Sequence, residues 1–242
     1  MSRHRFHVPE AAPGARVSLP EHSAHHARDV LRLRPEDAVA VFDGQGHEFA
    51  ATLDSVSRQG VSARITGTLS ARPESPLRIV LAVSPLRGDR MELVVQKAVE
   101  LGVAEIRPVV TVRTDAAARP ALKGTRQERW DKVASGAAEQ CGRAVVPPIA
   151  PTATLDALLA EPFAGLKLLF LERGSPPPLS THAPPPEVLL LVGPAGGWED
   201  AEVERAARAG FLTAGLGPRI LRAETAALVA VSAVQVLWGD LR

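Results

Sequence analysis

The sequence of 242 residues has few of the residue types on which many binding sites depend. It contains one cysteine, Cys141, so an intrachain disulfide is impossible and a structural zinc site is not expected. With no tyrosine, three tryptophans and six phenylalanines, it is poorly equipped to bind single strands by stacking bases on aromatic rings. The 28 Lys and Arg against 27 Asp and Glu leave almost no net charge, so a basic surface for RNA must come from local arrangement.

Long apolar runs are missing as well. No run approaches the roughly 18 residues that a membrane-spanning helix needs, and no early apolar segment resembles a signal peptide. The overall balance of 45% apolar and 23% charged residues is that of an ordinary globular protein. We therefore expect a cytoplasmic protein that does not bind a membrane.

Residues 1–70 are patterned mainly as short strands. A strand over 38–42 leads into Asp43-Gly44, a hairpin turn signal, and strands over 48–53 and 61–66 follow. A single helix is expected over about 22–33. Short strands at this spacing predict a small β-barrel.

The same segment is rich in histidine and arginine. The residues concerned are His4, His7, His22, His25, His26 and His47, with Arg3, Arg5, Arg28, Arg32 and Arg34. A metal site is not favoured, because no carboxylate or cysteine stands at a ligand spacing from these histidines. The residues alone leave open whether the helix face is merely solvated or contacts phosphates.

The pattern changes after the prolyl segment 71–76. Continuous apolar strands then alternate with helices, which is typical of an α/β domain with a buried parallel sheet. The expected strands are 78–83, 105–110, 166–171, 188–192 and 211–216, and the expected helices are 89–101, 125–140, 155–159, 199–208 and 224–238. The last helix is apolar nearly all round, so we expect it to be buried both inside its domain and in a subunit interface. We expect domains over 1–72 and 73–242.

The most informative stretch runs from Glu187 to Glu224. Its two apolar strands each end in a glycine-bearing loop, at 193–198 and at 217–225. If these are neighbouring strands of a parallel sheet, the two loops lie side by side at its carboxyl edge and form the floor of a small-molecule site. One such loop alone is better explained as a tight turn, but two of them, the second carrying Arg219, Arg222 and Glu224, favour a site.

The spacing of the glycines limits the ligand. It is not Gly-x-Gly-x-x-Gly and no Walker lysine follows, so nicotinamide and nucleoside triphosphate are poor candidates. The glycines leave room for a ligand to lie directly against backbone amides.

The motifs, taken together, resemble one family. Gly-Pro-Ala-Gly-Gly at 193–197 and Leu-Gly-Pro-Arg-Ile-Leu-Arg-Ala-Glu-Thr-Ala at 216–226 are similar to the signature of the RsmE-type ribosomal RNA uracil-N3 methyltransferases, of the SPOUT superfamily. The resemblance covers essentially the whole chain. Further matching segments are His26–Arg32, Arg87–Glu92, Gln96–Gly102 and Glu139–Arg143. Ala195 and Ala223 stand where the family usually has Glu and Thr, so a side-chain contribution at 195 is absent here.

The resemblance implies a PUA-like RNA-binding barrel followed by an α/β domain with a trefoil knot that binds S-adenosylmethionine. It also implies a homodimer that methylates N3 of a uridine in 16S ribosomal RNA, in the small ribosomal subunit, without a metal.

These implications assign roles to particular residues. A cofactor that is cationic at sulfur and apolar at adenine should be held by backbone groups and aliphatic walls, which we assign to Leu171, Glu172, Gly193, Pro194, Gly196, Gly197, Leu216, Gly217, Ile220 and Leu221. Arg222 and Arg219 are the candidates for stabilising charge on the base, and Glu224 for orienting an arginine or removing a proton. RNA contacts are assigned to Arg5, His26, Arg32, Arg87, Arg90 and Arg113.

Two other classes of protein remain as alternatives. The first is a non-catalytic RNA-binding or ribosome assembly factor that keeps the fold, which Ala195 would favour. A nicotinamide-dependent oxidoreductase is the poorer alternative.

Overall fold

The computed structural model describes residues 4–116, 126–173, 179 and 183–241, and the chain forms two compact units. The barrel unit consists of residues up to 74 together with 135–146, and the sheet unit of residues 75–134 and 147–242. Helix α3 (Gln127–Cys141) therefore begins in the sheet unit and contributes its second half, from Ser135, to the barrel unit. The division into domains 1–72 and 73–242 stays a prediction.

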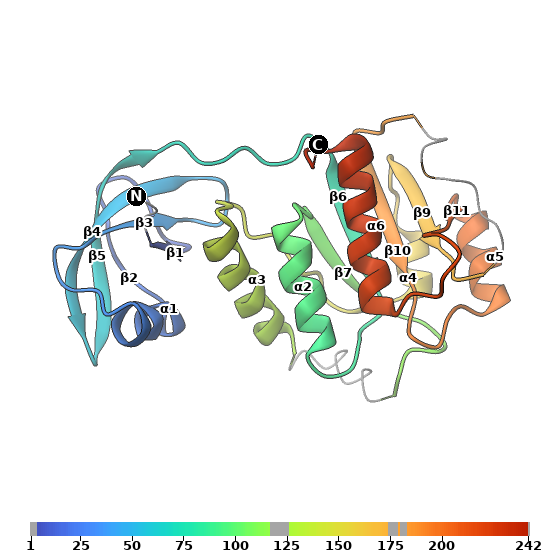
Figure 1. Cartoon of the computed structure of the whole chain (residues 1–242), viewed down its shortest axis with the longest axis horizontal. Coiled ribbons are helices and arrows are strands. Elements are labelled where there is room, and N and C mark those ends of the chain that lie inside the picture. The colour runs from blue at the N-terminus through green and yellow to red at the C-terminus, as the bar shows by residue number, and fades with distance from the viewer. Residues whose placement is uncertain (1–3, 117–125, 174–178, 180–182, 242) are drawn as a thin grey trace. The chain divides into compact units, whose positions relative to one another are not determined.

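The barrel unit is built on a curled, mixed five-stranded sheet (Figure 1). Its strands are β1 (Arg5–His7), β2 (Arg16–Ser18), β3 (Ala38–Phe42), β4 (Glu48–Ser57) and β5 (Gly60–Leu69), in the order β1-β3-β4-β5-β2. β1 pairs with β3 in parallel, and the other pairs are antiparallel. The expected hairpin after residue 42 is present, with a longer connection than a two-residue turn, because Asp43 accepts hydrogen bonds from the backbone of Gln45 and His47.

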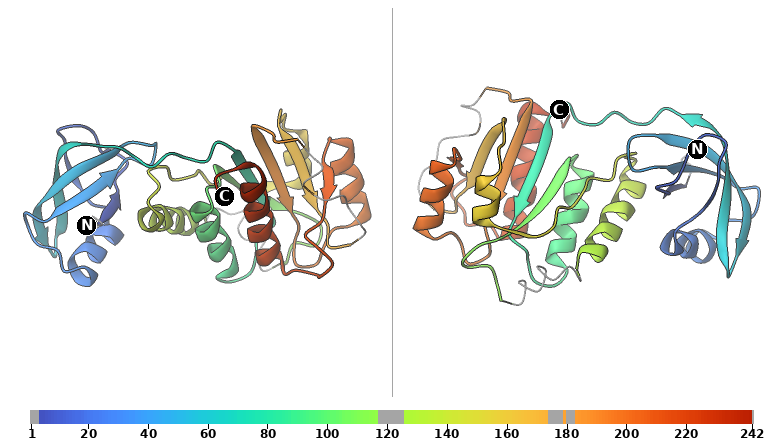
Figure 2. Two further views of the ribbon diagram at one scale, coloured as in Figure 1. Left: turned by 45° about the horizontal axis from the view of Figure 1, so that its top comes forward. Right: turned by 180° about the vertical axis from the view of Figure 1, so that it is seen from behind.

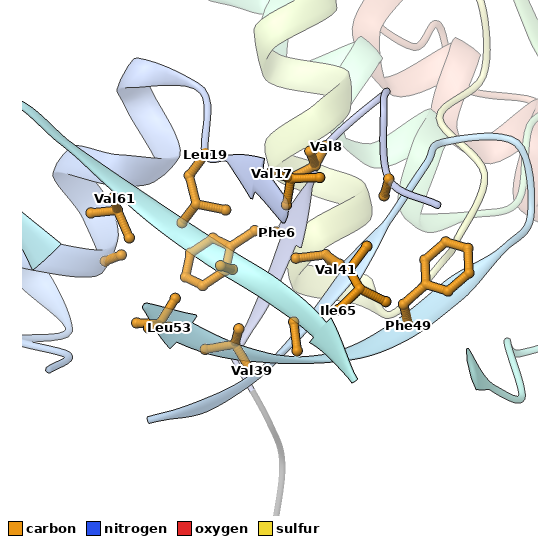
Figure 3. Packing of buried hydrophobic residues seen from close by; sticks show 14 of the residues in the cluster. Phe6, Val8, Val17, Leu19, Val39, Val41, Phe49, Leu53, Val61 and Ile65 are labelled. Carbon is orange, nitrogen blue, oxygen red and sulfur yellow. The ribbon is translucent and has the colours of Figure 1, made fainter. Parts of the chain in front are cut away.

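Alternating side chains give this sheet its core. In β5, Val61, Ala63 and Ile65 are buried, as the period of two along a strand requires. Figure 3 shows Val61 and Ile65 in one cluster with Phe6 and Leu53 of the other strands. Ala24 and Ala27 of the helical segment close the same core.

The helix expected over 22–33 is shorter and less regular than the periodicity predicts. α1 (Glu21–His25) continues into a π-helical turn, η1 (His26–Val30), and ends there. Arg32 follows with a φ of 55°, in the left-handed region, so it is outside the helix.

Arg5 has a structural role in the barrel unit. Its Nε donates to Glu48 at 2.8 Å, and its terminal NH groups donate to the carbonyl oxygens of Ala138, Glu139 and Arg143 at 2.9, 3.3 and 3.0 Å. These carbonyls lie at and just beyond the end of α3, where the helix supplies few donors, and that of Ala138 also accepts from the backbone of Gly142 at 3.2 Å. Arg5 is therefore committed to the end of α3, and we correct its assignment to RNA.

His7 joins the same two parts of the barrel unit. Its backbone N–H donates to Glu139 at 2.9 Å, and its ring Nδ1 lies 3.1 Å from Ser135 Oγ. The ring also stacks on Phe42. Burial lowers the pKa of His7 below its usual value, so the neutral ring is favoured in this contact.

The sheet unit contains six parallel strands in the order β11-β9-β10-β6-β7-β8. The strands are β6 (Arg78–Val83), β7 (Glu105–Val110), β8 (Ala153–Thr154), β9 (Leu166–Phe170), β10 (Glu187–Val192) and β11 (Leu212–Ala214). The helices are α2 (Arg90–Glu100), α4 (Leu155–Ala160), α5 (Asp200–Arg208) and α6 (Ala223–Trp238), together with the first half of α3. The alternating α/β pattern predicted from the sequence is confirmed.

Helices cover both faces of this sheet. On one face, α4 and α5 pack against a cluster that includes Leu169, Leu189, Leu191 and Trp198. On the other face, α6 contacts β6, β10 and α2, and α2 and α6 lie side by side in both figures (Figure 1, Figure 2). Burial on both sides explains why β6 and β10 are continuous apolar runs.

The sequence had led us to expect that the two strands of the Glu187–Glu224 stretch are neighbours in the sheet. They are not. β9 lies between β10 and β11 and pairs with both. The second apolar run forms strand only over 212–214, and Phe211 before it donates its backbone N–H to the carbonyl of Ala206 in α5 at 3.0 Å. The loop after β9 thus separates the two glycine loops.

Candidate active site at the carboxyl edge of the parallel sheet

Five loops leave the sheet unit at one edge. Ala214 pairs with Phe170, Phe170 with Val192, and Val192 with Val83, so four strands reach this edge in one row. β7 adds the segment that follows Val110. Ligands of parallel α/β sheets bind at this edge.

A cavity of about 490 Å³ lies among the loops after β9, β10 and β11. All ten residues assigned to the cofactor from the sequence line it, and so do Arg219, Arg222 and Glu224. The structure therefore brings together the predicted cofactor and catalytic residues. This volume is within the range of ordinary small-molecule sites, about 300–1,000 Å³.

The cavity also has walls that the sequence reasoning missed. These are Arg90, Phe170, Val192, Ala195, Trp198, Ala223 and Ala226. Phe170 and Val192 are the last residues of their strands. They could have been predicted from the sequence, because each stands at the end of an apolar run. Arg90 lies at the start of α2, and no pattern in the sequence around it indicates that it lines this cavity.

In the loop after β10, Gly193 is required by a close contact and Gly197 by its backbone conformation. A Cβ on Gly193 would lie 2.7 Å from the indole of Trp198, which is buried and donates its Nε1–H to the carbonyl of Phe170 at 3.0 Å. A Cβ on Gly197 would lie 2.5 Å from Oε1 of Glu172, and Gly197 has a φ of +70°. The loop is thus held between a fixed indole and the Glu172 carboxylate, with its backbone open to a ligand.

A second cavity, of about 700 Å³, lies between the segments 85–90 and 194–196. It brings together Arg87, Arg90 and Arg113, three of the six residues assigned to RNA. Arg87 pairs with Asp115 at 3.4 Å, and Arg113 donates to the carbonyl of Gly196 at 3.2 Å.

Buried hydroxyl groups hold the two arginine-bearing loops together. Ser84, after β6, lies 2.7 Å from Thr114 through their hydroxyl oxygens, and Thr114 Oγ1 accepts from the backbone of Thr111 at 2.8 Å. Because β6 and β7 are neighbouring strands, Arg87 and Arg113 reach the same cavity.

The arginine that pairs with Glu224 in the first cavity is Arg90. Glu224 lies 3.7 Å from the Nε of Arg90, and its side chain is only 13% exposed. Among the residues that the structure describes, neither Arg219 nor Arg222 forms an ion pair, and both are exposed. The ion pair of Glu224 is therefore with Arg90 and with neither of the two arginines beyond Gly217.

Two more of the residues assigned to RNA, His26 and Arg32, belong to the barrel unit. His26 and Arg32 are exposed, but neither lines the polar cavity of about 600 Å³ that lies beside α1 and the β4–β5 turn. That cavity is lined by His25, Arg28 and Arg58. Arg58 was missed because the turn after β4 carries no other basic residue near it in sequence.

The part of the chain that the structure describes has neither a metal site nor a membrane span. Within the described ranges, no group of three or more His, Cys, Asp or Glu side chains is arranged to hold a metal ion. Over the same part of the chain, no helix has the length and apolar character to cross a membrane.

Two families of domain match the sequence. Residues 73–235 match the RNA methyltransferase domain family, and residues 19–66 match the RNA methyltransferase PUA domain family. The RNA methyltransferase match alone covers more than half of the chain.

Individual relatives match over most of their lengths. The chain is 34% identical to ribosomal RNA small subunit methyltransferase E of Synechocystis, over 95% of this chain and 76% of the relative. It is 32% identical to the protein of the same name from Bacillus subtilis, over 92% of both.

Solved structures of similar proteins have the same fold. A ribosomal RNA small subunit methyltransferase E from Neisseria gonorrhoeae, bound to S-adenosyl methionine, is 38% identical with a TM-score of 0.90 over 100% of both chains. A putative methyltransferase from Legionella pneumophila, in complex with bound SAM, is 36% identical with a TM-score of 0.93 over 100% of both chains. The matched domains, the glycine-walled cavity and these relatives lead to one conclusion: the chain belongs to the ribosomal RNA small subunit methyltransferase E family.

Proposed function

We propose that the chain transfers a methyl group from S-adenosylmethionine to N3 of a uridine in 16S ribosomal RNA. The observation that carries the proposal is the cavity at the carboxyl edge, lined by Gly193–Gly197 and Leu216–Leu221, in a chain of this family. The solved relatives that bind S-adenosylmethionine support the same cofactor.

The cavity has the chemistry that this cofactor requires. Phe170, Leu171 and Val192 offer an apolar wall for adenine, and the Glu172 carboxylate suits hydroxyl or ammonium groups. Gly193 and Gly197 leave no room for a Cβ but open their backbone groups to the ligand. When bound, the cofactor supplies an electrophilic methyl group on a cationic sulfur.

The chain's own residues must deal with the proton on uridine N3. N3 becomes a nucleophile as its proton leaves, and the negative charge then spreads onto O2 and O4 of the ring. Cations positioned at these oxygens stabilise that charge. We assign this role to Arg222 and Arg219 beside the first cavity, with Glu224 holding Arg90 or taking part in proton removal.

Arginines from both units suit the RNA backbone. Arg87, Arg90 and Arg113 gather at the second cavity, and His26 and Arg32 are exposed on the barrel unit. Arg58 joins the proposed RNA contacts because it lines the barrel cavity, where Arg28 is already paired with Asp29 at 2.6 Å. Contacts of this kind position RNA and make affinity fall with salt.

We further propose a cytoplasmic homodimer with a trefoil knot in the sheet unit. The support for the dimer is an apolar stripe on α6, where Val229, Val236 and Leu237 are 38%, 55% and 38% exposed. The support for the knot is the family, together with the return of α6 from beyond β11 to contact β10 and β6.

The test is methyl transfer to small ribosomal subunits that lack the modification. Purified full-length protein is incubated with these subunits and labelled S-adenosylmethionine, and the RNA is digested to nucleosides. We expect label in 3-methyluridine. Binding of subunits without transfer of label would support a non-catalytic assembly factor instead.

A further inference from the structure

Arg90 is placed differently from every other charged residue at the active site. It lines both the cavity assigned to the cofactor and the second cavity, and the other residues common to both are Pro194, Ala195 and Gly196. Among the described residues, it is thus the only charged side chain on the wall between the cavities. Arg219 and Arg222 line only the first cavity, and Arg87 and Arg113 only the second.

The second cavity suits a base attached to a phosphate backbone. Pro85, Leu86 and Pro194 give it apolar surface for a flat ring, while Arg87 and Arg113 supply positive charge. Ala195 has a small side chain at the boundary, so little bulk separates the second cavity from the first. A base in the second cavity therefore meets the cofactor cavity at the shared wall.

The surroundings of Arg90 make its guanidinium available at that wall. The distance of 3.7 Å from its Nε to Glu224 is longer than a hydrogen bond, so Glu224 holds Arg90 by charge without occupying its donors. The Arg90 side chain is half exposed, whereas Glu224 is 13% exposed. Arg90 is also the first residue of α2, where the helix dipole adds positive potential.

We propose that the target uracil lies in the second cavity with its N3 edge at the shared wall. There Arg90 is a catalytic residue that contacts one of O2 and O4 as N3 loses its proton, and the other oxygen is left to Arg219 or Arg222 in the first cavity. This inference rests on the proposed function. In the transfer, the N3 electron pair forms the bond to the methyl carbon while the carbon–sulfur bond breaks and its electron pair stays on sulfur. The N3 proton leaves to a base or to solvent, and Arg90 offsets the charge that develops on the ring.

The experiment compares Arg90→Ala with Arg87→Ala, which removes the same charge from the second cavity alone. Steady-state rates are measured with small ribosomal subunits and labelled cofactor, and cofactor binding is measured by calorimetry. We expect Arg90→Ala to lower kcat by a hundredfold or more while the cofactor Kd changes by less than threefold. We expect Arg87→Ala to raise KM with kcat nearly unchanged, because the role assigned to Arg87 is a contact with backbone phosphate.

The pH profile separates stabilisation of charge from simple positioning. Without the cation at the ring, N3 gives up its proton less readily, so the rate of Arg90→Ala should continue to rise at a pH where that of the wild type has levelled off. Arg90→Lys should recover part of kcat, as should guanidinium ion added to Arg90→Ala. Arg208→Ala, an exposed position on α5 outside both cavities, is the control for loss of a charge.

Two results would overturn the inference. If Arg90→Ala raised only KM, Arg90 would be a phosphate contact, and if it weakened cofactor binding more than tenfold, Arg90 would belong to the cofactor site. Failure of the wild type to methylate the subunits would reject the proposed function itself.

Discussion

The glycines of the loop after β10 are needed for different reasons. Gly193 is fixed by the indole of Trp198, whereas Gly197 combines a positive φ with the Glu172 carboxylate at its Cα. Gly217, in the loop after β11, also has a positive φ, of +93°, but a Cβ there would meet nothing within 4 Å. A comparison of substitutions at Gly197 and Gly217 therefore separates the cost of a strained backbone conformation from the cost of a contact with a neighbouring side chain.

We expect Gly197→Ala to weaken cofactor binding at least tenfold more than Gly217→Ala does. Both variants adopt a left-handed conformation that costs an L-residue about 1–2 kcal/mol. Only the alanine at 197 also displaces Glu172 from the cavity. Calorimetry gives the two Kd values and thermal unfolding the two stabilities. Equal Kd values would show that Glu172 moves aside without affecting the cofactor.

At this scale, the residues assigned from local signals lie together in the structure. The ten cofactor candidates follow strand ends in two glycine loops and one charged turn, and all of them line one cavity. Arg5 was misassigned because its acceptors, Ala138 and Glu139, are more than 130 residues away in sequence. Arg90 was assigned only to RNA, since its place on the shared wall depends on how α2 is set beside the glycine loop.

At the scale of elements, apolar periodicity predicted strands and helices but not the order of the strands. β9, β10 and β11 each appear in the sequence as an apolar run, and no feature of a run says which two are neighbours. The insertion of β9 between the other two follows from the whole sheet. It also determines the site, because the loop after β9 supplies Leu171 and Glu172 between the glycine loops.

One buried carboxylate joins α5 to the loop that carries Arg113. Glu202 is 1% exposed, and its two oxygens accept hydrogen bonds from the backbone of Val112 at 2.9 Å and of Glu199 at 3.1 Å. The second bond forms part of the capping box at the start of α5. Glu202 thus fixes the residue before Arg113 while it caps the helix.

Replacing Glu202 by Ala should lower the free energy of unfolding by about 2–4 kcal/mol, because two hydrogen bonds to a buried carboxylate are lost. The measurement is chemical denaturation followed by circular dichroism. Glu204→Ala is the matched control, since Glu204 is exposed on the same helix and should change stability little. A similar small change in both variants would mean that Glu202 does not fix the loop.

For the whole molecule, the expected burial of the last helix is realised only in part. Ala227, Ala230, Val231 and Val234 of α6 are buried inside the sheet unit. The face bearing Val229, Val236 and Leu237 remains exposed, at positions spaced by seven and eight residues along the helix. That spacing makes a continuous stripe, which favours contact with a second copy of the chain. Composition predicted that the helix is apolar all round, and only the packed unit distinguishes the two faces.

The exposed apolar stripe on α6 predicts that a charged side chain placed on it prevents dimerisation. Val236→Glu places a carboxylate at the centre of the proposed interface, where it would be buried without a partner, and we expect the dimer to dissociate. Light scattering coupled to size-exclusion chromatography gives the mass directly. Leu212→Glu is the control, because Leu212 is exposed to a similar extent, 46% against 55% for Val236, but lies on β11. A dimer that survives Val236→Glu and dissociates with Leu212→Glu would move the interface to the edge of the sheet.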